Sequence, residues 1–306
     1  MMRGTYLNGF ILGVTLALTI AGCAASKSQN KPAAAAPAAA SADAFAAEAL
    51  GSYQLQRDGA RSLTLIAAAV KQAPNRADIE YLQVALCRLI EGCGPEPFEA
   101  RLRKLDAGNA VVWIRALSSA QRQRDVNVEA QVLDAIGRSE RFDVYWNSLA
   151  AGIARARAPG PKNVDAALGD TIGWLSETIV PSMQPIAAAC TRVRTAEAAW
   201  ADRCRRVARV LMSGDTYLAE SIGLVIAKQV TADPVEVTKL NDRDRASRYL
   251  WRTSAEIVGS QVERDKFSAE HLKLMAKLRR EQDVHLAITR WSGRPVTPPA
   301  DFRMDE

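Results

Sequence analysis

The stretch "RKLDAGNAVVWIRALSSAQRQRDVNVEAQVLDAIGRSERFDVYW", residues 103–146, contains the clearest helix signals of this chain. Apolar residues recur in it three and four positions apart, a spacing that places them on one face of an α-helix. Asn109 precedes the apolar segment AVVWIRAL, and asparagine is a favoured N-cap residue. The stretch therefore predicts two helices, 109–121 and 125–138, joined by a short polar turn.

The same spacing extends over most of the 306-residue chain, whereas the strict alternation typical of β-strands is scarce. Because short turns separate the helical segments, we predict an all-α fold, an array of antiparallel helical hairpins. The expected helices cover residues 43–56, 59–73, 76–91, 95–105, 109–121, 125–138, 142–157, 163–179, 183–190, 196–213, 215–231, 234–258 and 268–291.

The segment "RAPGPKN", residues 157–163, is the strongest internal break, because proline and glycine interrupt helices. We therefore divide the folded part into an N-terminal region, 43–158, and a C-terminal helical region, 159–306. In the second region, Asp215 or Gly214 and then Ser268 are expected to open helices.

The unit beginning at residue 103 resembles a tetratricopeptide repeat. Such units present an acidic or proline turn, then Asn-Ala, a tryptophan four residues into the first helix and a second helix rich in small residues. These correspond here to Leu105-Asp106, Asn109-Ala110, Trp113, and Leu133 to Ile136. A more degenerate unit begins at residue 71. The resemblance implies a concave binding surface in region 43–158, but no clear third copy follows, and a generic helical array is the alternative.

A short apolar run occupies residues 10–20 and overlaps the six residues Leu18-Thr19-Ile20-Ala21-Gly22-Cys23. The run is too short to span a bilayer and is typical of an export signal. The six residues resemble the lipobox of bacterial lipoproteins. In that family the cysteine receives acyl chains and the chain is cut just before it, which implies a signal peptide, 1–22, and a lipid on Cys23. An uncleaved anchor or a chance cysteine is the alternative. Ala24 after the cysteine favours the outer membrane, by the same resemblance.

Residues 23–42 hold small and polar residues with two prolines and are expected to form a tether between the lipid and the folded part. The formal net charge of the chain is +6. A basic chain sometimes binds nucleic acid, but an exported protein rarely meets any. We therefore expect no nucleic-acid partner, and interpret the charge as solubility or attraction to anionic lipid or glycan surfaces.

Four cysteines remain after Cys23, and an even number in an exported chain suggests two disulfides. Cys87 lies near the end of a predicted helix and Cys93 follows Gly92. If Gly92 is the left-handed residue past the helix end, the next residue folds back toward the previous turn, where Cys87 lies. We therefore pair Cys87 with Cys93.

Cys190 and Cys204 would lie about 21 Å apart on one continuous helix, too far for a bond. Their disulfide therefore requires a break, expected near residues 191–195. Four buried reduced cysteines are the alternative. A zinc site is not expected, because no C-x2-C spacing occurs.

Common catalytic motifs are missing from the sequence: it has no G-x-S-x-G elbow, no H-E-x-x-H pair and no glycine-rich phosphate loop. The two histidines, His271 and His285, fall in one predicted helix. They would lie about 21 Å apart there, so they are expected to be surface or helix-end residues and to bind no metal.

Glu220-Ser221 lies inside an apolar helix, an arrangement that resembles lytic transglycosylases, in which such a glutamate is the general acid that cleaves peptidoglycan. The family's Gly-Leu-Met-Gln-type segment does not follow. We therefore interpret Glu220 as a structural residue at the rim of a packed helix, with catalysis as the alternative.

Two further groups of residues have structural interpretations. Four arginines, Arg203, Arg205, Arg206 and Arg209, span two helical turns and are expected to form a solvated face, or else a patch for an acidic partner. The tryptophans fall about once per hairpin and are expected to be wedges in the core; they are Trp113, Trp146, Trp174, Trp200, Trp251 and Trp291.

These observations predict a binding or scaffolding lipoprotein that is anchored through Cys23. We expect it to bind an envelope protein through the exposed helix faces between 76 and 157. A helical carrier of an apolar ligand, such as a lipid, is the alternative, and a peptidoglycan-cleaving enzyme using Glu220 is a third. We expect no catalytic residue in 43–306, no cofactor and no metal.

Overall fold

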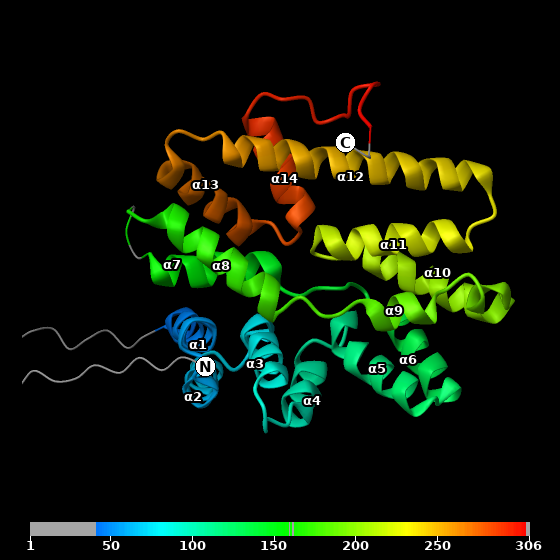
Figure 1. Ribbon diagram of the computed structural model, residues 1–306, viewed down its shortest axis with the longest axis horizontal. Helices are drawn as coiled ribbons and strands as arrows, with labels where there is room; N and C mark the ends of the chain where they lie inside the picture. Colours follow the sequence, from blue (N-terminus) through cyan, green and yellow to red (C-terminus); the bar gives the residue numbers. More distant parts are fainter. Residues whose placement is uncertain (1–40, 159, 161, 304–306) are drawn as a thin grey trace, which may run out of the picture. The chain divides into compact units, whose positions relative to one another are not determined.

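The computed structural model describes residues 41–158, 160 and 162–303 (Figure 1). The regular elements of this part are all helices, so the fold is all-α, as predicted. One isolated backbone bridge joins Asn109 and Arg141. The predicted signal peptide, the lipid site at Cys23 and nearly all of the tether lie outside the described residues.

The described helices follow one another with short connections, and several neighbours in sequence pack as hairpins, such as α1 with α2, α7 with α8 and α10 with α11 (Figure 1). In chain order they are α1 (Ala42–Gln56), α2 (Gly59–Gln72), α3 (Ala77–Leu89), α4 (Glu96–Leu105), η1 (Ala110–Trp113), α5 (Ile114–Gln123), α6 (Val126–Arg138), α7 (Trp146–Arg157), α8 (Val164–Thr178), α9 (Gln184–Ala189), η2 (Arg194–Ala196), α10 (Ala198–Met212), α11 (Tyr217–Val230), α12 (Pro234–Gly259), α13 (Arg264–Lys277) and α14 (Glu281–Trp291).

Some helix starts in the array are fixed by side-chain caps. Asn109 accepts the backbone N–H of Val111 at 3.2 Å, which confirms it as a cap. The cap of α11 is Thr216, one residue after the expected Asp215. Helix α13 starts at Arg264, earlier than expected, and Ser268 lies inside it. Other capping side chains are Ser41, Asp58, Asp125 and Asp233.

The predicted helix 142–157 starts only at Trp146, because the residues before it are hydrogen-bonded to distant partners. The backbone N–H of Ala110 donates to the carbonyl of Arg141 at 2.8 Å, and that of Asp215 donates to the carbonyl of Phe142 at 3.1 Å. Long-range hydrogen bonds thus replace the local ones that a helix would make.

The predicted helix 268–291 is wrong, because the chain turns at residues 278–280 and separates α13 from α14. The carbonyl of Leu278 accepts from the side-chain amide of Asn147 at 2.8 Å. The backbone N–H of Glu281 donates to the carbonyl of Asp215 at 2.8 Å. These tertiary bonds occupy backbone groups that would otherwise continue the helix.

One hydrophobic core continues across the predicted boundary at residue 158, and the described residues from Ser41 onward form one unit. Helix α10 packs against α6 and α11, while α13 packs against α7 and α8. The hydroxyl of Tyr81 donates to the carbonyl of Ile179 at 2.6 Å inside this core. Among the described helices, none has both the length and the apolar character required to cross a bilayer.

Candidate functional site

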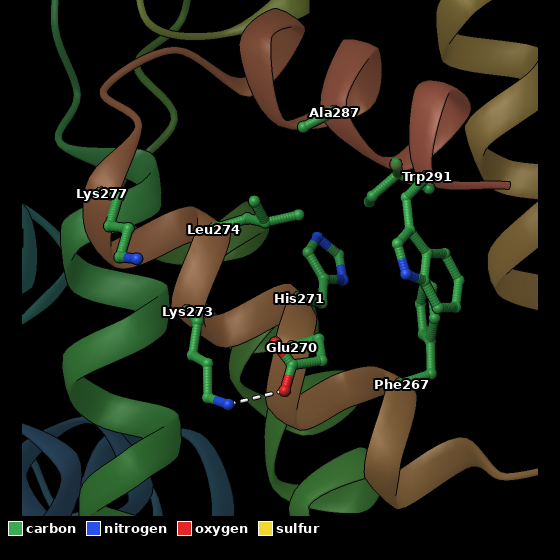
Figure 2. A pocket seen from close by; sticks show the side chains of 9 residues that line it. Phe267, Glu270, His271, Lys273, Leu274, Lys277, Ala287 and Trp291 are labelled. Atoms are coloured by element: carbon green, nitrogen blue, oxygen red, sulfur yellow. Dashed lines mark hydrogen bonds and ion pairs between the residues drawn. The ribbon is translucent and has the colours of Figure 1, made fainter. Parts of the chain in front are cut away.

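A cavity lies between α13 and α14, at the place where the turn at residues 278–280 folds the second helix back beside the first (Figure 2). Its volume is about 260 Å³. The lining combines apolar side chains with a smaller number of polar ones: Phe267, Glu270, His271, Lys273, Leu274, Lys277, Ala287, Ile288 and Trp291. A mostly apolar pocket with a few polar groups is the usual form of a small-molecule site.

Aromatic rings form one wall of the cavity. The rings of Phe267 and Trp291 have centroids 5.6 Å apart, and those of Phe267 and His271 are 6.0 Å apart. Phe267 is buried, whereas Trp291 is 63% exposed. Trp291 is therefore not a core wedge, and neither is Trp251, which is 47% exposed. The core interpretation holds for Trp200, which is buried.

The opposite side of the cavity carries two lysines from the C-terminal half of α13 (Figure 2). The ammonium group of Lys273 donates to Glu270 Oε1 at 2.6 Å, so these two charges compensate each other. Lys277 makes no hydrogen bond or ion pair with any residue that the structure describes. The mouth of the cavity therefore has one uncompensated positive charge.

His271 lies in the wall between the aromatic rings and Leu274 (Figure 2). Burial, together with the neighbouring His285, lowers the pKa of His271 to about 4. Its imidazole is therefore neutral at pH 7. Within the described part of the chain, its ring nitrogens have no hydrogen-bond partner, so they remain available to a group that enters the cavity.

His285 is brought near His271 by the turn, so the predicted separation along one helix is wrong. Its Nδ1 lies 2.6 Å from Ser254 Oγ, and its Nε2 lies 3.5 Å from Glu281 Oε1. Ser254 is only 1% exposed, and its hydroxyl donates to the carbonyl of Trp251 at 2.9 Å, so it accepts from Nδ1 of His285. The contact between Ser254 and His285 ties α12 to α14, and the sequence could not indicate it because the two residues lie on different helices with no shared motif.

Glu220 is buried and held between basic residues of other helices. Its carboxylate accepts from Arg243 Nε at 2.7 Å, Ser247 Oγ at 3.3 Å and Arg280 at 3.4 Å. These bonds join α11 to α12 and to the turn before α14 through the Glu220 carboxylate.

Both predicted cysteine pairs are joined in the structure. Cys87 and Cys93 have Cα atoms 5.2 Å apart, and Gly92 between them has a φ of +78°, the left-handed conformation expected there. Cys190 and Cys204 have Cα atoms 5.7 Å apart. The break that their bond requires is the connection between α9 and α10.

The arginine cluster of α10 is divided between internal and surface partners. Arg206 pairs with Asp134 of α6 at 2.8 Å, and Arg203 lies 3.3 Å from the same carboxylate. Arg205 pairs with Asp202 at 3.1 Å on its own helix. The cluster therefore joins α10 to α6 instead of forming a wholly solvated face.

Among the described residues, no group of three or more histidine, cysteine, aspartate or glutamate side chains is placed to hold a metal ion. No protein-family model matches the chain, and neither curated proteins nor solved structures give a match. What the chain does is therefore inferred from its residues and their geometry.

Proposed function

We propose that this chain is a lipid-anchored binding protein of the bacterial envelope, held to the outer membrane through Cys23 and facing the periplasm. The sequence from Leu18 to Cys23 motivates the anchor, and several acyl chains on one residue give stable attachment.

The pairing of Cys87 with Cys93 and of Cys190 with Cys204 is the observation that carries the proposed location. Disulfides persist in oxidising compartments and are rare in the reducing cytosol. All four cysteines of the folded part are used in this way, which leaves Cys23 as the thiol available for lipid.

Binding is the proposed activity, without a catalytic residue, a cofactor or a metal. A protein partner is proposed for the exposed helix faces between 76 and 157, where Leu89, Val126 and Val128 are the exposed large apolar side chains. The tetratricopeptide-like character of these hairpins is part of the same proposal, because such units bind partners along a surface.

A carrier of a small apolar ligand is the second candidate function, and the cavity between α13 and α14 favours it. That cavity is mostly apolar, and Trp291 and Lys277 at its edge are exposed to solvent, so a ligand can reach it. Both candidates share the same anchor and differ only in the site used.

Replacement of Cys23 by serine tests the proposed anchor. The Cys23→Ser chain is expected to remain as unprocessed precursor or to leave the membrane fraction, because the acyl chains have no attachment point. As a control, Ser26→Ala in the adjacent tether should leave membrane attachment unchanged. If the Cys23→Ser chain has the mature size and stays in the membrane fraction, the proposed anchor is wrong.

A further inference from the structure

The cavity between α13 and α14 is polarised from one end to the other. Phe267 and Trp291 form an apolar end, and Lys273 and Lys277 stand at the opposite side (Figure 2). A ligand that fills such a site needs an apolar body and a charged head at opposite ends, which is the definition of an amphiphile.

We propose that this cavity binds a small amphiphilic carboxylate, with its hydrocarbon body between Phe267 and Trp291 and its anionic head at Lys277. The inference rests on the second candidate function above, and it names the chemical class of the ligand.

Charge complementarity selects an anion over an amine or a neutral alcohol. Glu270 already accepts from Lys273, so the pair contributes little net charge. Lys277 has no partner in the described residues and remains to attract a carboxylate. An ammonium head would face this lysine without a free carboxylate to compensate it. Because Lys277 is exposed, its attraction is screened by salt.

His271 gives an independent reason to expect a ligand. The imidazole is half-buried, and a polar group at the edge of an apolar cavity normally bonds either water or a polar partner. His271 has none among the residues described, and Figure 2 shows its ring facing the space between the helices. A polar ligand group entering from the mouth would supply that partner.

The size of the cavity limits the ligand. A volume of about 260 Å³ lies just below the range of pockets for drug-sized molecules, which begins at about 300 Å³. Roughly nine groups of the size of a water molecule fit, at ~30 Å³ each. A chain of about eight carbons therefore fits inside, with its carboxylate at the mouth.

Titration calorimetry with three eight-carbon probes tests the charge selectivity. The sample is the chain from Ser41 to Glu306, which contains every described helix, both disulfides and the hydrophobic core. Octanoate is expected to bind at least threefold more tightly than octan-1-ol and tenfold more tightly than octylamine at low ionic strength. Equal affinities, or no binding of octanoate, would overturn the proposal.

Single substitutions locate the site. Lys277→Gln should weaken octanoate three- to tenfold and leave octan-1-ol unchanged, whereas Lys239→Gln, a matched change on α12, should leave both unchanged. Trp291→Ala removes an exposed wall without disturbing the core and should weaken both probes. Unchanged octanoate affinity in both Lys277→Gln and Trp291→Ala would place the ligand elsewhere.

The two histidines provide a direct spectroscopic report, since the chain contains no others. Octanoate should shift the ring-proton resonances of His271 more than those of His285, which is closed in by Ser254 and Glu281. Shifts at neither ring would contradict the proposed pose. These measurements do not depend on Cys23, so failure of the ligand and failure of the anchor are distinguishable.

Discussion

The buried carboxylate of Asp215 accepts the backbone N–H of Val144 at 3.0 Å, across 71 residues of sequence. Its second oxygen accepts the backbone N–H of Trp146 at 2.9 Å. The backbone N–H of Asp215 donates to the carbonyl of Phe142, and its backbone carbonyl accepts from the N–H of Glu281. One residue thus holds together the start of α7, the start of α11 and the turn that places α14.

Asp215→Asn is expected to lower the free energy of unfolding by about 1–3 kcal/mol at pH 7.5, because an amide offers only one acceptor oxygen to two buried N–H groups. Urea denaturation measures the change. The exposed Asp202 provides the matched control, and Asp202→Asn should cost less than about 1 kcal/mol, as surface ion pairs do. Equal small effects of the two changes would show that Asp215 does not join these segments.

The pH dependence of stability should contain two opposing contributions. Burial, reinforced by Asp143, raises the pKa of Asp215 to about 7 from its usual 3.8. The folded state therefore retains a proton that the unfolded state has lost, so this contribution falls as pH rises from about 4 to 7. Burial lowers the pKa of His271 to about 4 from 6.5, so its contribution rises between those values.

Stability of the wild-type chain should therefore change little between pH 4.5 and 6.5. With Asp215→Asn it should rise with pH, and with His271→Gln it should fall, each by up to about 1.4 kcal/mol per pH unit. Urea midpoints at several pH values measure these slopes. Identical slopes in the two variants would contradict the assignment of the two titrations.

Removal of either disulfide should destabilise the fold, and slightly more for the bond that closes the longer loop. Cys190→Ala with Cys204→Ala opens a loop with a sequence separation of 14 and should cost about 3 kcal/mol. Cys87→Ala with Cys93→Ala opens a separation of 6 and should cost slightly less, about 2 kcal/mol. Urea denaturation without reductant compares them, and a fully reduced wild-type protein from the periplasm would refute both bonds.

Glu220→Gln is expected to destabilise the chain by about 1–2 kcal/mol, since a hydrogen-bonding amide replaces a paired carboxylate while Arg243 can reach solvent. Peptidoglycan turnover in cells should not change. The exposed Glu236→Gln is the matched control for stability. Loss of turnover in Glu220→Gln, with folding preserved, would favour the enzyme over the binding protein.

Local signals in the sequence were sufficient for most helices and for the cysteine pairs. Asn109 caps the residues that follow it, and Gly92 reverses the chain beside Cys87, so each signal lies next to the feature that it indicates. Asn109 also bonds the distant Asp143, a contact that the sequence does not indicate. The tertiary features were missed for a physical reason. The turn at residues 278–280 is held by Asn147 and Asp215, far away in sequence, so periodicity predicted one long helix and separated His271 from His285.

The cavity depends on that missed turn. Its lining residues look like parts of one amphipathic helix until α14 folds back, and only then do Phe267 and Trp291 face each other. The sequence supplied the residue types, and the long-range hydrogen bonds supplied their arrangement.

The mass of the N-terminal peptide of the mature protein, isolated from membranes, tests the central proposal most directly. A lipid-anchored envelope protein should begin at Cys23, carry acyl chains on that residue and lack residues 1–22. An unmodified Cys23, or a mature chain that still begins at Met1, would contradict the account.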